Sequence, residues 1–253
     1  MRRRFAIILG GGRSARMGRD KRALKLDGRS LLALAVEACT GRDLIVAVTP
    51  DLPDDVGADR VACTLEDPPF GGPVAGIAAG IAALPSAHSD DEVLLLACDL
   101  PRVAEIVAVL DAVPLADGVE AAPGCGVSTS STGGGSSPDR AISADRRSST
   151  EHTGPADGGR PAGAGTPAGK GLDRLDRRGR LDCVCLVDAE QYPQYLAARY
   201  RRTALEARLV EVGETRAVSV RRLMRGLSVR GILASEIAVD IDTPDEASAA
   251  GIS

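Results

Sequence analysis

The hydrophobic positions of the chain form short apolar runs that alternate with stretches of helical periodicity. Between residue 4 and about residue 123, the apolar runs predict buried strands at 5–9, 43–49, 60–67 and 92–99. The stretches between them predict helices at 30–39, 74–84 and 103–113. Buried strands that alternate with helices are typical of a sheet covered on both faces. The pattern therefore predicts a three-layer α/β fold with a mostly parallel sheet.

Two of these helices carry local signals. Ser30 stands at the start of its apolar run and suits an N-cap, because a hydroxyl can accept a hydrogen bond from a free backbone N–H. The segment 74–84, VAGIAAGIAAL, is built mostly from small residues. Such a helix can approach a sheet closely.

The second half of the chain begins with a change of composition. Residues from about 124 to 180 are dominated by Gly, Ser, Thr, Ala and Pro, and they offer too little apolar area to offset chain entropy. We expect a disordered insertion that interrupts a single domain spanning 1–253. Beyond it, the pattern predicts a β-pair at 183–188 and 195–200, followed by a helix at 203–212. A last strand is predicted at 236–242, and Thr243-Pro244-Asp245 predicts the start of a final helix.

Charge and cysteine usage narrow the class of protein. A net charge of -4 and a sequence pI of about 5.4 argue against a general nucleic-acid binder. No apolar run is long enough to span a membrane, and the apolar core at 5–9 is too short for a signal peptide, so we expect a cytoplasmic protein. The cysteines form no CxxC pair, which disfavours a zinc site. Those in apolar segments are interpreted as ordinary buried thiols: Cys39, Cys63, Cys98, Cys183 and Cys185.

The first predicted strand ends in a glycine-rich segment, Leu9-Gly10-Gly11-Gly12. Glycines let backbone N–H groups come close to an anion. Cationic side chains follow within a short span, at Arg13, Arg16, Arg19, Lys21, Arg22 and Lys25. Open α/β sheets bind ligands beyond the carboxyl ends of their strands, so this segment predicts a loop that holds a triphosphate.

Two familiar phosphate motifs do not account for this loop. Walker A requires GxxxxGK[ST], but Gly18 is followed by Arg-Asp-Lys. The dinucleotide fingerprint GxGxxA can be drawn through Gly10, Gly12 and Ala15. It should lead straight into a helix and then to a strand that ends in an acid, whereas the second strand ends near Thr49 and a proline. A dehydrogenase of the Rossmann type is therefore disfavoured.

The segment 9–32, LGGGRSARMGRDKRALKLDGRSLL, resembles the signature of the molybdenum cofactor guanylyltransferases and their nucleotidyltransferase relatives. That signature reads L-A-G-G-x-S-x-R-M-G-x-D-K and continues into a short L-x-G turn. One position departs from it, because Gly10 stands where alanine is usual. The resemblance covers the chain except for the insertion and implies a Rossmann-like nucleotidyltransferase fold.

Three further segments fit the same resemblance. EDPPFGGPVAGIAAGI is similar to the family's acid-then-G-P-L-A-G segment, where Asp67 matches the aspartate that contacts the nucleotide. LLLACDLP is similar to its D-x-P motif, which makes Asp99 a metal ligand; the alternative is a cap for the helix after Pro101. VDIDTPDEA resembles its last motif, in which Asp240 or Asp242 could support the metal or the acceptor, while Asp242 could equally cap a final helix.

The resemblance implies transfer of GMP from GTP to molybdenum-molybdopterin, with release of pyrophosphate. Arg16 and Lys21 would neutralise the β- and γ-phosphates, and Asp99 would hold Mg²⁺. Base and sugar would be held by Leu9, Gly10 and Gly11, and the implied nucleotide contacts also include Lys21, Asp67 and Asp99.

Other functions stay open at this point. A sister cytidylyl- or sugar-phosphate nucleotidyltransferase would share the loop and the metal ligand. A catalytically silent nucleotide-binding partner in cofactor delivery would need no metal carboxylate. The implied partners are GTP and molybdopterin, with room for contact with molybdenum-insertion proteins or molybdoenzyme chaperones, and neither nucleic acid nor membrane is expected.

Overall fold

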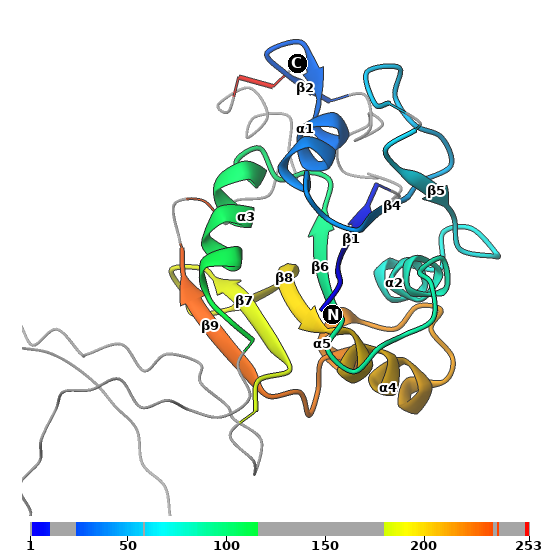
Figure 1. The fold of residues 1–253 in the computed structure, drawn as a ribbon, viewed down its shortest axis with the longest axis vertical. Coiled ribbons are helices and arrows are strands. Elements are labelled where there is room, and N and C mark those ends of the chain that lie inside the picture. Colours follow the sequence, from blue (N-terminus) through cyan, green and yellow to red (C-terminus); the bar gives the residue numbers. More distant parts are fainter. Residues whose placement is uncertain are drawn as a thin grey trace, which may run out of the picture. The chain divides into compact units, whose positions relative to one another are not determined.

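A seven-stranded sheet organises the described part of the chain (Figure 1). The computed structural model describes residues 2–10, 24–57, 59–115, 180–234, 237, 251 and 252. The strands, given in their order across the sheet, are β5 (Ala62–Thr64), β4 (Leu44–Val48), β1 (Arg4–Leu9), β6 (Glu92–Ala97), β8 (Pro193–Arg201), β7 (Cys183–Val187) and β9 (Val229–Leu233). A separate hairpin joins β2 (Lys25–Leu26) to β3 (Arg29–Ser30).

The sheet is mostly parallel, as the sequence predicts. β1 runs parallel to β4 and to β6, β5 runs parallel to β4, and β9 runs parallel to β7. Only β8 among these strands runs against its neighbours, and it pairs with β6 on one side and β7 on the other. The predicted β-pair is therefore confirmed, with a register shift between Cys185 and Leu186.

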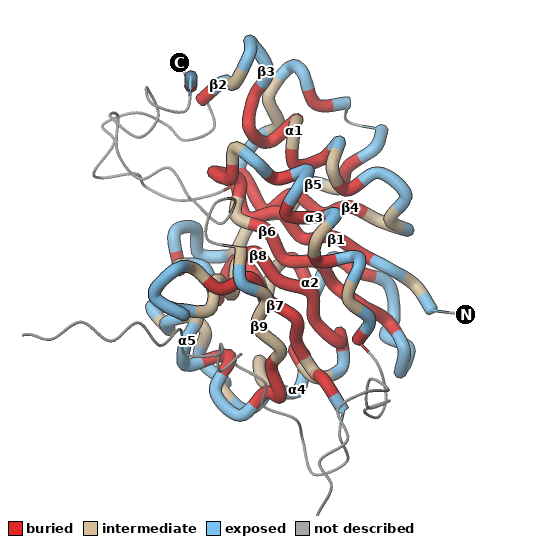
Figure 2. The backbone as a smooth tube through the Cα atoms, turned by 90° about the vertical axis from the view of Figure 1, so that its left-hand side faces the viewer, coloured by how far each residue is buried: buried red, intermediate tan, exposed pale blue. Residues whose placement is uncertain are grey.

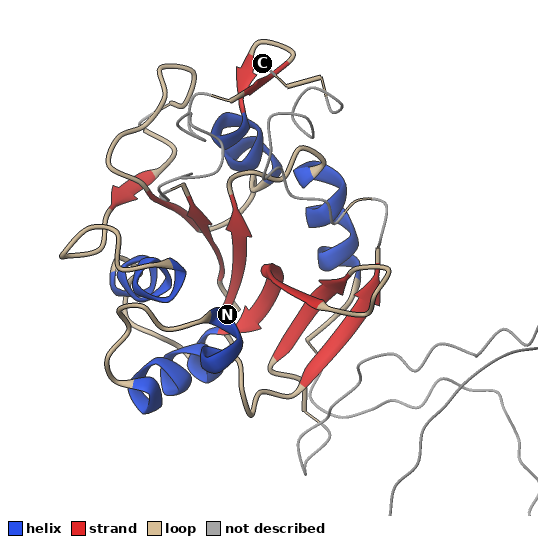
Figure 3. Cartoon of the chain, turned by 180° about the vertical axis from the view of Figure 1, so that it is seen from behind, coloured by secondary structure: helices blue, strands red, loops and turns tan. Residues whose placement is uncertain are grey.

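Helices cover both faces of the sheet (Figure 3). Ala6 and Ile8 of β1 face the helices α1 (Leu31–Ala38) and α3 (Val103–Ala112). Phe5 and Ile7 face the other side, where they join the core formed with α2 (Pro73–Ala82), α4 (Arg202–Val212) and α5 (Val220–Leu223). Figure 2 shows the resulting buried central strands between more exposed helices. The three-layer α/β fold is confirmed.

The local signals of the first two helices act as expected. The Ser30 hydroxyl accepts a hydrogen bond of 3.1 Å from the Ala33 N–H, so Ser30 is the N-cap of α1. In α2 the small residues allow close contact with the sheet. A Cβ atom on Gly80 would lie 2.6 Å from Ile7 Cγ2, and one on Gly76 would lie 3.3 Å from Leu9 Cδ2. Glycine at position 80 is therefore required for α2 to pack at this distance from β1.

Some predicted boundaries differ from the structure. The strand predicted at 60–67 is limited to β5, because the residues after Thr64 leave the sheet to line a pocket. β9 was not predicted, since its sequence VRGIL contains an arginine and a glycine and its pairing partner lies more than forty residues away. The strand predicted at 236–242, the final helix start and the insertion at 124–180 lie outside the described residues, except for Arg180 and Ile237.

The described residues belong to one compact unit, formed by the segment before residue 116 and the segment from residue 180 onward. Arg201 joins the two segments of this unit. Its buried guanidinium donates hydrogen bonds of 2.9 Å to the Leu115 carbonyl and 2.8 Å to the Leu181 carbonyl. Leu115 and Leu181, which are far apart in the sequence, are thus both held at Arg201. No helix in the described part combines the length and apolar character that a membrane span needs.

One prediction about the cysteines is wrong. Cys39, Cys98, Cys183 and Cys185 are buried thiols, as expected, but Cys63 is exposed. It lies on β5, the outermost strand, which the helices of neither face cover fully. Its thiol donates a 3.2 Å hydrogen bond to the Thr49 carbonyl, and partial burial raises its pKa. Cys125 lies outside the described residues.

We expect Cys63 to be the one described cysteine that a thiol reagent modifies in the native protein. In a Cys125→Ser background, mass spectrometry after iodoacetamide treatment should find one modification, at Cys63. Because the thiolate is the reactive form and the pKa of Cys63 is raised, the rate should still be rising at about pH 9, above the ordinary thiol pKa. Burial raises the pKa of Cys39 to about 12, so Cys39 should react only after unfolding. Native modification at several cysteines, or at none, would contradict this reading of the edge strand.

Candidate functional site

The order of the strands places a crevice beside β1. The chain leaves β1 for β4 and β5 on one side and then crosses to β6 on the other side. In open α/β sheets, ligands bind at such a switch point, outside the carboxyl ends of the strands. Here Leu9 pairs with both Val48 and Ala97, so the three strands end at the same level. The switch point is therefore formed by the ends of β1 and β6.

Backbone hydrogen bonds extend the strand pairing past these ends. The Gly10 N–H donates to the Val48 carbonyl at 3.0 Å, and the Cys98 N–H donates to the Leu9 carbonyl at 3.1 Å. Leu9 and Gly10, predicted to contact a nucleotide, thus lie at the switch point. Gly10 stands where the signature usually has alanine, and the structure shows what a larger side chain would meet there. A Cβ atom there would lie 3.2 Å from Thr49 Cβ, so the threonine occupies the space next to the glycine.

Asp99 follows the end of β6 by two residues and lies at the same crevice. It is 9% exposed, although a carboxylate is costly to bury without a cation or hydrogen bonds. The alternative interpretation of Asp99 is a cap for the helix that follows. The N-cap of α3 is Arg102, and it makes no side-chain cap hydrogen bond. The position of Asp99 next to the glycine-rich segment suits a carboxylate that meets a cation or a phosphate-bound metal.

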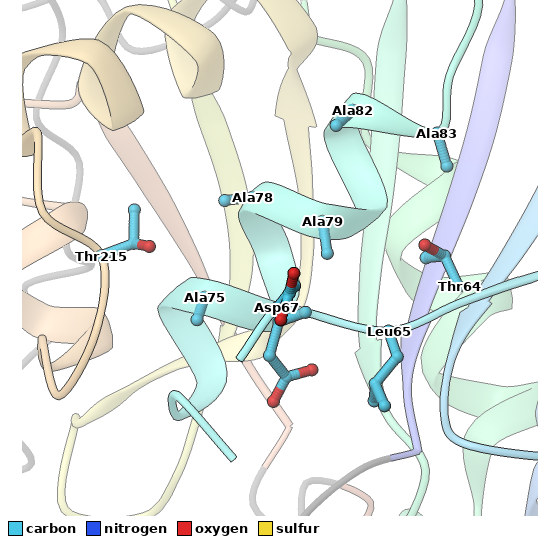
Figure 4. Close-up of a pocket in the computed structure, with 10 residues that line it drawn as sticks. Thr64, Leu65, Asp67, Ala75, Ala78, Ala79, Ala82, Ala83 and Thr215 are labelled. Atoms are coloured by element: carbon cyan, nitrogen blue, oxygen red, sulfur yellow. The ribbon is translucent and has the colours of Figure 1, made fainter. Parts of the chain in front are cut away.

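Asp67 lies farther along the same half of the sheet, between β5 and α2. It is exposed and lines a cavity of about 450 Å³ on the outer side of α2 (Figure 4). In Figure 4, Thr64, Leu65 and Asp67 follow one side of α2, and Thr215 faces the helix from the opposite side. The cavity is lined by Thr64, Leu65, Glu66, Asp67, Ala75, Ala78, Ala79, Ala82, Ala83 and Thr215.

The lining of this cavity sets what it can bind. Glu66 and Asp67 bring carboxylates, and the alanines of α2 bring an apolar wall; among the described lining residues there is no lysine or arginine. Carboxylates accept hydrogen bonds from hydroxyl and N–H groups. The described lining therefore suits ribose hydroxyls or the N–H edge of a base. Sequence analysis missed Glu66 and Thr215; Thr215 carries no local signal, because it comes near Asp67 only through the tertiary fold.

The structure does not describe every predicted site residue. It brings Leu9, Gly10 and Asp99 together at the switch point and places Asp67 in the neighbouring cavity. Gly11, Arg16 and Lys21 of the loop, and both Asp240 and Asp242, lie outside the described residues.

The described residues also bear on metal binding. No cluster of three or more His, Cys, Asp or Glu side chains in the described part could hold a metal by itself. Mg²⁺ is commonly bound through one or two carboxylates together with waters and substrate phosphates. Asp99 supplies one such carboxylate, so the described residues fit a metal ion that binds together with a nucleotide.

Solved structures share the fold of this chain. The chain resembles a nucleotidyl transferase from Methanothermobacter, with a TM-score of 0.55, 15% identity and coverage of 98% of this chain and 95% of that one. It also resembles the molybdopterin-guanine dinucleotide biosynthesis protein A of Archaeoglobus fulgidus, with a TM-score of 0.51, 16% identity and coverage of 98% and 96%. The fold is the Rossmann-like fold of nucleotidyltransferases, as the sequence predicts.

Sequence comparison finds a similar family. Residues 6–125 match the family model described as MobA-like NTP transferase domain. A probable molybdenum cofactor guanylyltransferase of Synechococcus elongatus is 40% identical over 105 residues, which cover 39% of this chain and 52% of the relative. The molybdenum cofactor guanylyltransferase of Rhizobium meliloti is 40% identical over 80 residues, covering 30% and 36%. The chain thus matches about half the length of these relatives or less. Residues 6–125, which match the family model, contain Leu9, Gly10, Asp67 and Asp99.

Proposed function

We propose that this chain transfers GMP from GTP to molybdenum-molybdopterin and releases pyrophosphate, which forms the guanine dinucleotide cofactor. The observation that carries the transfer reaction is the junction of Leu9, Gly10 and Asp99 at the switch point, where backbone groups and a buried carboxylate meet. The choice of guanine and of molybdopterin rests on the relatives, whose names state guanylyl transfer.

The proposed reaction forms one bond and breaks one. A phosphate oxygen of the acceptor attacks the α-phosphorus of GTP, the bond from that phosphorus to the bridging oxygen of the β-phosphate breaks, and pyrophosphate leaves with the electron pair. No covalent protein intermediate is needed. Positioning and neutralisation of charge would supply the catalysis.

Each predicted site residue has a role in this proposal. Arg16 and Lys21 neutralise the β- and γ-phosphates and the leaving pyrophosphate, while Leu9, Gly10 and Gly11 offer backbone contacts to base and sugar. Asp67 accepts hydrogen bonds from the ribose or the base. Asp99, with Asp240 or Asp242 as a second candidate, would hold Mg²⁺, which would polarise the α-phosphate when bound.

The proposal extends to the whole chain. We treat residues 1–253 as one nucleotidyltransferase domain, interrupted at about 124–180, that acts in the cytoplasm. Contacts with molybdenum-insertion proteins or molybdoenzyme chaperones would pass the product on.

A thermal-shift panel tests the choice of nucleotide. A ligand that binds only the folded state stabilises it by RT ln(1 + [L]/Kd), so the unfolding temperature reports on binding. GTP with Mg²⁺ should raise the unfolding temperature more than ATP, CTP or UTP with Mg²⁺. Selective stabilisation by CTP would reject the guanylyl assignment in favour of a sister cytidylyltransferase.

Pyrophosphate release then separates an enzyme from a silent binder. With GTP and Mg²⁺ present, release should depend on added molybdenum-molybdopterin. Binding of GTP without any acceptor-dependent release would favour the catalytically silent partner and overturn the proposal.

A further inference from the structure

A threonine from the second half of the chain helps to line the cavity that contains Asp67. Thr215 lies in the loop between α4 and α5, far from Asp67 in the sequence, and contributes to the same cavity of about 450 Å³. Its side chain is partly exposed. Figure 4 shows the Thr215 hydroxyl oxygen on the side that faces α2. This hydroxyl is therefore available to a ligand that lies in the cavity.

Backbone hydrogen bonds hold the loop that carries Thr215. The Arg216 N–H donates a 3.0 Å hydrogen bond to Glu214 Oε1. The Ala217 N–H donates a 2.8 Å hydrogen bond to the Gly71 carbonyl, which ties the loop to the segment in front of α2. Ala217 takes a φ of 56°, which a residue other than glycine keeps only where its surroundings hold it. Thr215 is thus held in place before a ligand enters, which lowers the entropy cost of binding through it.

The described lining divides its hydrogen-bonding groups between two sides of α2. Glu66 and Asp67 bring carboxylates, which only accept hydrogen bonds when ionised. Thr64 lies on the same side as Asp67, whereas Thr215 faces the helix from the opposite side (Figure 4). A threonine hydroxyl can donate as well as accept. A planar ligand on the alanine wall, with its N–H groups toward the carboxylates, would therefore turn another edge toward the hydroxyl of Thr215.

Guanine has the groups that this arrangement can bind. Its N1–H and its N2 amino group are donors, which suit the carboxylates of Glu66 and Asp67. Its O6 and N7 atoms are acceptors and form a separate edge of the base. Adenine shares N7 but carries a donor amino group at the position of O6. A hydroxyl that donates to the edge formed by O6 and N7 thus complements guanine.

We propose that Thr215 is a specificity-determining residue whose hydroxyl donates a hydrogen bond to the O6 and N7 edge of guanine in bound GTP. The inference rests on the proposed function, because it names a contact of GTP at the same site. Loss of one hydrogen bond between neutral groups weakens binding about fivefold.

Isothermal titration calorimetry with GTP and two analogues tests the contact. In 7-deaza-GTP a C–H group replaces N7, and in 6-thio-GTP sulfur, a weak acceptor, replaces O6. Each ligand is titrated with Mg²⁺ into the full-length wild type and into Thr215→Val, which keeps the shape of the side chain without its hydroxyl. The wild type should bind GTP about fivefold more tightly than at least one analogue. In Thr215→Val the Kd for GTP should rise about fivefold, to that of the same analogue.

Two further variants separate the hydroxyl from other effects of the substitution. Thr215→Ser keeps the hydroxyl and should bind GTP as the wild type does. Thr203→Val is the matched control, because Thr203 is exposed on the first turn of α4 and is not among the described residues that line the cavity. Its Kd for GTP should equal that of the wild type. In the enzyme assay, Thr215→Val should raise the KM for GTP and leave kcat and the KM for the acceptor unchanged.

Three results would overturn the proposed contact. Thr215→Val could bind GTP as the wild type does, it could lose affinity for GTP and both analogues to the same extent, or it could raise only the KM for the acceptor. Failure of the wild type to bind any nucleoside triphosphate would instead overturn the proposed function.

Discussion

Replacement of Asp99 by asparagine is expected to lower turnover by about 10²–10³-fold, the loss typical when one preorganised charge-stabilising group is removed. The side chain keeps its size, so the fold should persist, but the negative charge at the end of β6 is lost. Asp99 is 9% exposed, and its negative charge is what it would contribute as a metal ligand. Acceptor-dependent pyrophosphate release measures the effect, and far-UV circular dichroism checks the fold.

Two further variants sharpen this test. Lys21→Ala should also lower turnover by orders of magnitude, because the proposed partner of the leaving pyrophosphate is removed. Asp90→Asn is the matched control. It removes the same charge at the opposite end of the same strand, where Asp90 is exposed and accepts only a 3.3 Å hydrogen bond from Ser89 among its described contacts. Wild-type turnover in Asp99→Asn or Lys21→Ala would contradict the assigned site.

Asp91→Asn is expected to destabilise the protein by about 3 kcal/mol, the cost typical of removing one partner from a buried ion pair. The Asp91 side chain is 0% exposed and accepts hydrogen bonds of 3.0 and 2.5 Å from Arg3 and 2.9 Å from the His88 N–H. Arg202, the first residue of α4, lies 3.5 Å from the same carboxylate. Both arginines also lie over the Phe5 ring, at 5.3 and 5.6 Å from its centroid. Loss of the charge leaves two guanidinium groups without their shared counter-ion.

The destabilisation should depend on pH. Burial alone would raise the pKa of Asp91, but hydrogen bonds from Arg3 and from the His88 N–H, with the charge of Arg3, outweigh it and lower the pKa. A carboxyl whose pKa is lowered by folding stabilises the native state above its unfolded pKa of about 3.9. This stabilisation is lost as pH falls through the lowered pKa. The stability difference between wild type and Asp91→Asn should therefore be full at neutral pH and shrink in acid below about pH 4.

Urea unfolding at neutral and acid pH measures this difference. Asp90→Asn serves again as the control, because a change at an exposed neighbouring position should alter the free energy of unfolding by about 0.5 kcal/mol or less. Equal stability of Asp91→Asn and wild type at neutral pH, or a difference that grows in acid, would contradict a structural role for the ion pair.

Much of the fold was evident in the sequence because the relevant signals are local. The runs at 5–9 and 93–98 are apolar at every position, since strands covered on both faces bury both sets of side chains. Ser30 caps α1 through a hydrogen bond to a residue three positions away, and the glycines of α2 allow a close approach whatever strand they meet. Leu9, Gly10, Asp67 and Asp99 could be predicted as site residues because each lies within an ordered motif at or soon after a strand.

Other features depended on contacts between distant residues. β8 pairs with β6 across about a hundred positions, and nothing near 193–201 indicates which strand lies on its other side. Cys63 has an apolar neighbourhood in sequence, yet it is exposed because its strand is the outermost one. Thr215 reaches the cavity with Asp67 only once the sheet has formed. The same holds for the buried carboxylate of Asp91, which meets Arg3 and Arg202 only in the folded sheet. By itself, the sequence determined the strands, caps and motifs that short-range chemistry specifies; only the tertiary structure decided which edges are exposed and which distant charges share a buried site.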